Sequence, residues 1–300
     1  MILQATSQPS RHHEVIPAAD LAATRRAAIT ALAGRLRKRT PVDVQGYAAS
    51  FEDNLLPGLT PPTRAGVKKE LGGGAGSELG RARPKAAAAH SSAGLAVNAF
   101  ARWRDGDALA QLPVAGVRGF DAMAFERPFP SGLRGTAPHL DVVLNRASTT
   151  VAVESKCIEP LAPHAASFSP AYDDLVASVA APSWQALFND LRADPSRFQL
   201  LDAAQLLKHY LGLKRLGSPV TLMYVYWEPT DADDIPAFVQ HRQEIAHLHA
   251  ALHDPDVAFE SLSYPELWRT WELEDDSPPW LGDHLAGLRA RYAVPLSGAA

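Results

Sequence analysis

The sequence predicts an α/β (α+β) protein built on a β-sheet with helices on its flanks. Two runs rich in β-branched residues, 140–144 and 150–156, are joined by the polar residues 145–148, a pattern typical of a β-hairpin. An amphipathic helix follows from Asp202, and the almost wholly apolar residues 219–227 then predict a strand buried on both faces. This order of elements is the main support for the fold class.

The 300 residues have an ordinary globular composition, 46% hydrophobic and 21% charged, which is enough for one large core. No apolar run is long enough to cross a bilayer, and the first 15 residues lack the apolar region of a signal peptide. The single cysteine, Cys157, excludes an internal disulfide and a multi-cysteine zinc site, and we expect it to be buried. We therefore expect a cytoplasmic protein that does not act at a membrane.

Charge is distributed unevenly along the chain. The net charge is −4, but residues 1–104 carry 15 Lys and Arg against 7 Asp and Glu. This basic third either contacts the phosphates of a nucleic acid or pairs with the acidic remainder of the protein, and both interpretations remain open.

Three charged side chains converge at one end of the predicted hairpin. Glu154 and Lys156 share a face, because alternate residues of a strand point the same way, and Asp141 lies roughly opposite them. Such charges are costly to bury unpaired, and two carboxylates are suitable ligands for Mg²⁺. The metal would activate a water, while the lysine would orient or deprotonate that water or stabilise the charge on a phosphate. The residues therefore suggest phosphodiester hydrolysis.

Asp141 followed by Glu154-Ser155-Lys156 resembles the D…(D/E)xK signature of the PD-(D/E)xK, restriction-endonuclease-like nuclease superfamily. Pro138 precedes Asp141 by three residues rather than one, so the Pro-Asp half of the signature is loose. Residues 76–230 also resemble bacterial proteins classed as restriction-endonuclease-like. The resemblance implies a central mixed β-sheet flanked by helices in αβββαβ order. It also implies a nuclease that uses Mg²⁺, or Mn²⁺ as a substitute, with DNA as the expected substrate.

The resemblance implies two further site residues. An acidic residue near the first core helix often joins the metal cluster of this superfamily, and Glu78 matches that position, which makes Glu78, Asp141 and Glu154 the expected metal ligands. A polar residue on the helix after the catalytic strand often reaches the centre, which makes Gln205 an expected accessory and Lys208 an alternative. For each of these, an ordinary loop or exposed helix residue is an equal alternative.

Four segments are expected along the chain: a disordered tail at 1–19, a basic helical N-terminal extension at 20–75, a nuclease-like core at 76–230 with an insertion at 160–198, and a helical C-terminal extension at 231–300.

Several local predictions accompany this division. Asp20 is expected to cap the first helix, residues 45–56 to form a short helix, and residues 57–84 to be mainly a flexible, glycine-rich loop. Residues 84–106 are interpreted as one helix. Residues 117–129 are interpreted as the first strand, on which Glu126 is expected to face solvent.

A histidine-rich helix lies in the C-terminal extension. His241, Glu244 and His247 have helical spacing that could bind a transition metal, but an exposed polar face is the preferred interpretation.

Two rival functions remain at this stage. One is a nuclease fold without catalysis that binds nucleic acid or a protein partner. The other is an α/β enzyme of different chemistry in which Asp141, Glu154 and Lys156 form a structural ion pair. A homodimer is possible, since many nucleases of this superfamily dimerise to cut both strands.

Overall fold

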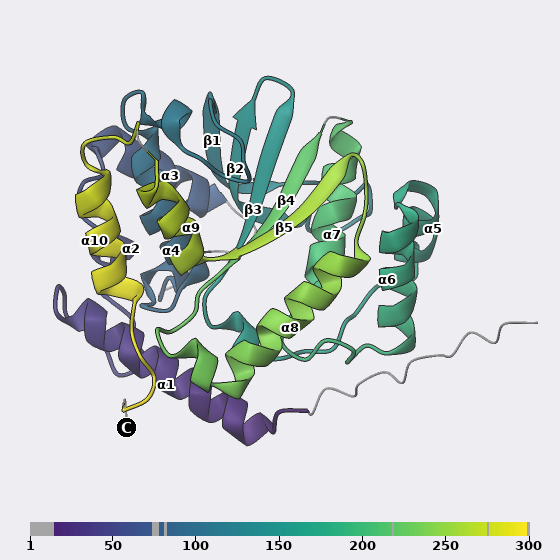
Figure 1. The fold of residues 1–300 in the computed structure, drawn as a ribbon, viewed down its shortest axis with the longest axis horizontal. Coiled ribbons are helices and arrows are strands. Elements are labelled where there is room, and N and C mark those ends of the chain that lie inside the picture. The colour runs from purple at the N-terminus through teal and green to yellow at the C-terminus, as the bar shows by residue number, and fades with distance from the viewer. Residues whose placement is uncertain (1–14, 74–77, 81–82, 218, 275, 299–300) are drawn as a thin grey trace, which may run out of the picture.

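The computed structural model describes residues 15–73, 78–80, 83–217, 219–274 and 276–298. The chain folds around one five-stranded sheet with helices on both sides (Figure 1). No helix within the described ranges is long and apolar enough to cross a bilayer. Most of the tail predicted to be disordered, residues 1–14, lies outside the described residues.

The strands follow one another across the sheet in chain order. They are β1 (Ala122–Pro128), β2 (His139–Arg146), β3 (Thr149–Lys156), β4 (Val220–Tyr226) and β5 (Val257–Ser263). The first three strands pair antiparallel, whereas β3, β4 and β5 pair parallel. The sheet is therefore mixed, as expected.

The hairpin of β2 and β3 confirms the sequence prediction, with a shorter turn. The ladder closes at the pair Arg146 and Thr149, so the turn consists of Ala147 and Ser148 alone. Ala147 has a φ of 45°, in keeping with the left-handed backbone that two-residue hairpin turns require.

Helices build a separate apolar core on each face of the sheet. The first core includes α1 (Ala18–Arg37), α4 (Ser92–Phe100), α9 (Tyr264–Glu272) and α10 (Leu281–Tyr292). The second includes α5 (Ala171–Val179), α6 (Pro182–Ala193), α7 (Ala203–Leu213) and part of α8 (Pro236–Ala251). Successive β3 residues serve opposite cores, because Val151 and Val153 join the first and Ala152 the second.

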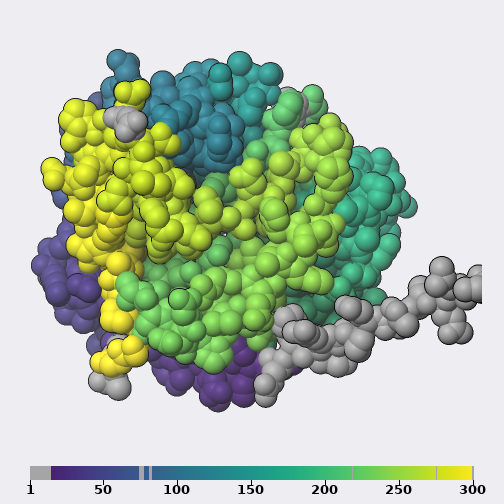
Figure 2. Space-filling model, in the orientation of Figure 1, coloured from purple at the N-terminus to yellow at the C-terminus, as the bar shows by residue number. Residues whose placement is uncertain are grey.

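The expected core order is present as α4–β1–β2–β3–α7–β4. The insertion after β3 contains α5 and α6, which pack beside α7 at one side of the molecule (Figure 1). The C-terminal extension is not purely helical as predicted, because β5 adds a parallel strand beside β4. In the space-filling view, α1 in purple follows the lower edge, beneath the green C-terminal segments (Figure 2).

The N-terminal extension differs from the prediction at its helix ends. Helix α1 begins at Ala18 behind Pro17, and no side chain caps it, so Asp20 lies inside the first turn. Pro17 takes the cap position because its carbonyl accepts the N–H groups of Asp20 and Leu21.

Local capping decided the remaining boundaries. The predicted helix at 45–56 shrinks to α2 (Phe51–Asn54), which begins at a capping box between Ser50 and Asp53. The predicted helix at 84–106 contains only a short 3₁₀ turn before α4, which Ser91 caps.

Part of the segment predicted to be a loop forms α3 (Pro61–Gly73), which starts with two prolines that a first turn tolerates. The helix buries Thr63, Val67 and Leu71 at a spacing of four residues. Burial of these three side chains stabilises the helix by more than the glycines of the segment destabilise it. Residues 74–76 of the glycine run lie outside the described residues.

Candidate active site

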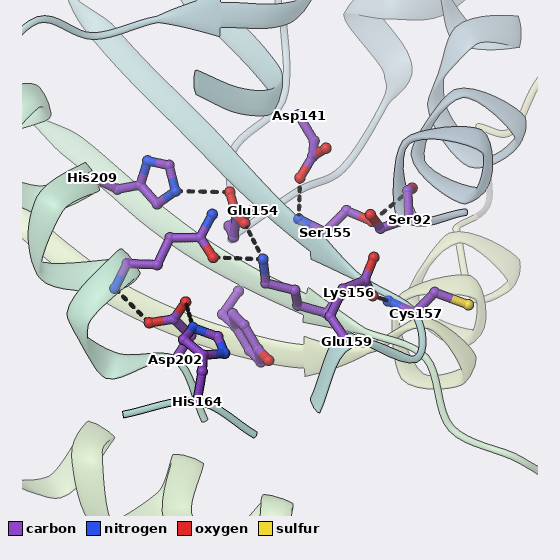
Figure 3. Close-up of polar contacts among 12 residues, drawn as sticks. Ser92, Asp141, Glu154, Ser155, Lys156, Cys157, Glu159, His164, Asp202 and His209 are labelled. Carbon is purple, nitrogen blue, oxygen red and sulfur yellow. Dashed lines mark hydrogen bonds and ion pairs between the residues drawn. The ribbon is translucent and has the colours of Figure 1, made fainter. Parts of the chain in front are cut away.

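A cleft of about 680 Å³ lies where β2 and β3 separate. The ladder between these strands reaches Val142 and Val153 and goes no further, although both strands continue. The backbone N–H of Ser155 instead donates to Oδ2 of Asp141 at 2.7 Å (Figure 3). The separation of the strands thus ties Asp141 to the end of β3, as the sequence predicted.

Glu154 and Lys156 share one face of β3 and contact each other. Lys156 Nζ donates to Glu154 Oε1 at 2.6 Å (Figure 3). It also donates to Gln205 Oε1 at 2.7 Å. The Glu154 side chain is 4% exposed and that of Lys156 is 12% exposed. Gln205 therefore reaches the Glu154–Lys156 pair, and its role as an accessory in catalysis stays a prediction.

Helix α7 supplies a second contact that the sequence analysis missed. His209 lies one turn after Gln205, and its Nε2 is 3.0 Å from Glu154 Oε2. The signal for His209 was its spacing of four from Gln205, which places the two side chains on the same helix face. Together the two residues hold both members of the Glu154–Lys156 pair.

Glu126 belongs to the cleft rather than to the surface, so the expectation that it faces solvent was wrong. Its side chain is 10% exposed, and it lines the cavity together with Asp141. Its φ is 51°, a left-handed value that is costly for a residue with a side chain and is often found at functional sites. Strand alternation failed here because a left-handed residue interrupts the regular pleat.

The Glu126 and Asp141 carboxyl groups are crowded by other negative charges. Burial, followed by the charges of Glu78 and Glu154, raises the pKa of Glu126 to about 7. Burial, followed by the charges of Glu154 and Glu126, raises the pKa of Asp141 well above its usual value.

Glu154 and Lys156 are both charged. Burial alone would raise the pKa of Glu154, but the neighbouring Lys156 and His209 hold it at about 2. Burial likewise opposes the charge on Lys156, yet Glu154 and Glu159 raise its pKa above the usual value. The lysine is therefore a fixed cation at neutral pH in this arrangement.

Glu78 lies in the loop before α4 and lines the same cleft as the other carboxylates. Its Oε1 is 3.5 Å from Lys85 Nζ. Glu159, which follows β3, folds back so that the N–H of Cys157 donates to its Oε2 at 2.6 Å.

Lys208 does not line the cleft, so the alternative that it reaches the centre is wrong. Its Nζ lies 5.3 Å from the centre of the Phe168 ring in the insertion. Cys157 is buried as expected, and burial raises the pKa of its thiol.

The chemistry of the cleft suits a hard divalent cation. Five carboxylate side chains line it: Glu78, Glu126, Asp141, Glu154 and Glu159. Burial and then mutual repulsion raise the pKa values of Asp141 and Glu126, and a bound cation would relieve that repulsion. Within the described residues, no three Asp, Glu, His or Cys side chains stand close enough to form a ready-made metal-binding group. The carboxylates fit a metal by charge and donor type.

The histidine-rich helix α8 has a structural role at the residues that suggested a metal. Glu244 accepts the backbone N–H groups of residues 199–201, at 2.8 to 2.9 Å. His241 Nε2 lies 3.0 Å from the Tyr224 hydroxyl, and burial lowers the pKa of His241 to about 3. Both residues are buried, so the exposed polar face expected here is restricted to others, such as His247.

The mixed sheet, the αβββαβ order and the cluster at the end of β3 define a restriction-endonuclease-like protein of the PD-(D/E)xK type. A family model described as "Restriction Endonuclease associating with ARP" matches residues 27–293, and the chain belongs to this family. The membership indicates a nuclease. Comparison with curated proteins and with solved structures gives no match.

Proposed function

We propose that this protein is a Mg²⁺-dependent nuclease that hydrolyses phosphodiester bonds in DNA, with Mn²⁺ as a substitute metal. The main support is that Asp141, Glu154 and Lys156 line one cleft, in which Lys156 contacts Gln205 from α7. Membership of a restriction endonuclease family agrees with this chemistry.

In this proposal the carboxylates of the cleft bind the cation. Asp141 and Glu154 are the main ligands, and Glu78 and Glu126 are close enough to the same cavity to add a third. The bound cation supplies a more acidic water and neutralises charge on the phosphate. Glu154 already has a contact on each oxygen, from Lys156 and His209, so a cation would share this carboxylate with them through the remaining lone pairs.

Lys156 stabilises negative charge on the reacting phosphate. Its raised pKa keeps it protonated, and a protonated lysine cannot accept a proton from water. An electrostatic role is therefore favoured over a role as general base. Gln205 holds the ammonium group in position from the other side.

The test is a cleavage assay on supercoiled plasmid and on single-stranded DNA, with Mg²⁺, Mn²⁺ or EDTA. We expect cleavage with either metal, none with EDTA, and none by Lys156→Ala. Lys208→Ala is the matched control, because this lysine lies over Phe168 outside the cleft, and it should cleave like the wild type. Equal cleavage by the wild type and Lys156→Ala would refute the proposal.

Partners follow from the same proposal. DNA is the macromolecular substrate, and a homodimer would let two clefts cut both strands. The family description also names association with ARP, so the assay is run on the isolated chain first, to learn whether cleavage needs that partner.

A further inference from the structure

Part of the cleft wall comes from the N-terminal extension rather than from the nuclease core. Arg25 of α1 and Tyr47 line the cavity together with Asp141 and Glu154. Arg25 also lies outside the part of the chain that matches the family model, which begins at residue 27. Helix α1 contacts the turn at Glu159–Leu161 directly after β3, so the extension is packed beside the catalytic strand.

Arg25 differs in its contacts from the arginines near the C-terminal end of α1. There the guanidinium groups of three arginines donate to backbone carbonyls: Arg35 to Ala293, Arg37 to Asp43 and Arg39, just past the helix, to Leu55. Arg25 makes no hydrogen bond or ion pair with any residue that the structure describes, and its Nε is shielded from solvent without a partner. Arg25 is half-buried, so its charge is partly removed from water without a compensating contact to the described residues, which makes it a ready ligand for an anion.

The charges around the cleft leave Arg25 as the cation available to a substrate. Lys156 is held by Glu154, and Lys85 lies near Glu78. His90, beside Arg25, is neutral, because burial and then the charge of Arg25 lower its pKa to about 4. A polyanion entering a cleft with five carboxylates needs an opposing positive charge. Among the described arginines and lysines that line the cleft, Arg25 is the one without a carboxylate partner.

We propose that Arg25 binds a backbone phosphate of the nucleic acid, beside the phosphate at which cleavage occurs. The inference rests on the proposed function for the identity of the occupant. An arginine suits this role because its planar fork matches phosphate oxygens. Helix α1 is then part of the substrate-binding surface, and the basic balance of the N-terminal third acts on the substrate through one residue of this helix, while its distal arginines serve the fold.

The test measures nucleic acid binding apart from cleavage. Fluorescence anisotropy of labelled single-stranded and duplex oligonucleotides is recorded with Mg²⁺ on the Lys156→Ala protein, into which Arg25→Ala is introduced. We expect roughly tenfold weaker binding, independent of base sequence, for the loss of one charge-assisted contact. The slope of log affinity against log salt concentration should fall by about 0.7 to 0.9, the value for one phosphate.

Arg26→Ala is the matched control, because Arg26 is an exposed neighbour on the same helix and is not among the residues of the cleft. It should keep nearly full affinity and the original salt slope, and Arg25→Lys should fall between. Thermal unfolding midpoints of all variants should agree closely, since Arg25 makes no hydrogen bond or ion pair with the described residues.

The outcomes separate this inference from the proposed function. Equal affinity and salt slope for Arg25→Ala and Arg26→Ala overturn the role of Arg25, while metal-dependent cleavage by the wild type still supports the nuclease. If nucleic acid binding depends on Arg25 but the wild type cleaves nothing, the role of Arg25 is supported and the nuclease proposal is refuted. A parent protein that binds no nucleic acid overturns both.

Discussion

Two buried glutamates, Glu154 on β3 and Glu244 on α8, are held by different kinds of partner. Glu244 accepts three backbone N–H groups at residues 199–201 and a fourth hydrogen bond from the amide of Gln240. Glu154 is held by two ionisable side chains, Lys156 and His209, and it lines the cleft.

The difference explains why one glutamate is structural and the other is suited to chemistry. Backbone amides cannot change charge or exchange partners, so the carboxylate of Glu244 fixes the loop that leads into α7. Side chains such as Lys156 can move to a phosphate, and a cation can replace them at Glu154. Burial of a carboxylate is therefore a weak sign of a site, whereas the nature of its partners and its access to a cavity are informative.

The largest expected effect is that of Glu154→Gln on cleavage. The amide keeps the shape of the side chain but removes the charge that binds a cation and holds Lys156, so the rate should fall about 10³-fold. Circular dichroism should show a folded protein at the assay temperature. A variant that cleaves within tenfold of the wild-type rate would contradict the assigned role of Glu154.

Glu244→Ala should act on stability instead. Three buried N–H groups lose their acceptor, and the free energy of unfolding in urea should fall by about 3 kcal/mol. Below the melting temperature, the folded variant should cleave at a similar rate to the wild type. Gln243→Ala, at an exposed neighbouring position, is the control and should change stability little. Unchanged stability in Glu244→Ala would show that the hydrogen bonds from residues 199–201 to Glu244 contribute little to the free energy of unfolding.

The third effect is on the pH dependence of stability without metal. Because the pKa of Glu126 is raised to about 7 in the folded state, its protonated form stabilises the protein below about pH 4.5, and this contribution is lost as the pH rises towards 7. The free energy of unfolding should fall by about 2 kcal/mol across this window. Glu126→Gln should lack that part of the decline.

Urea titrations at several pH values measure the difference between the two proteins. The pKa of Glu228 is also raised to about 7, chiefly by burial. Because Glu228 is present in both proteins, its contribution cancels when their pH profiles are compared. Identical pH profiles for the two proteins would mean that Glu126 does not titrate differently on folding.

The smallest expected effect is that of His209→Gln, since the amide can still donate a hydrogen bond to Glu154. The value of kcat/KM should stay within tenfold of the wild type, whereas His209→Ala should lose about tenfold or more. Titration with Mg²⁺ should rank the affinities in the same order: the wild type first, His209→Gln close to it, and His209→Ala weakest. Equal losses in both variants would indicate that His209 fills space rather than positioning Glu154.

The hairpin and its three charged residues were predictable because their determinants are local. Alternation along β3 puts Glu154 and Lys156 on one face whatever surrounds the strand, and the polar turn brings Asp141 alongside. The core order was likewise readable from successive hydrophobic patterns.

Other features of the site depend on residues far apart in the chain. In the sequence, Glu126 is an ordinary strand residue. Its left-handed backbone, which directs the side chain into the cleft, is visible only in the structure. In the sequence, His209 is one more residue of an amphipathic helix. Only the packing of α7 over β3 brings it to Glu154. The strand β5 was missed because its partner, β4, lies across an intervening helix.

The sequence by itself determined the hairpin, the order of the core elements and the pairing of Glu154 with Lys156, because near neighbours in a strand need no other part of the chain to set their directions. Only the tertiary structure decided that Glu126, His209 and Arg25 meet those residues. They come from β1, α7 and α1, and only the packing of these elements brings charges so distant in sequence into one cleft.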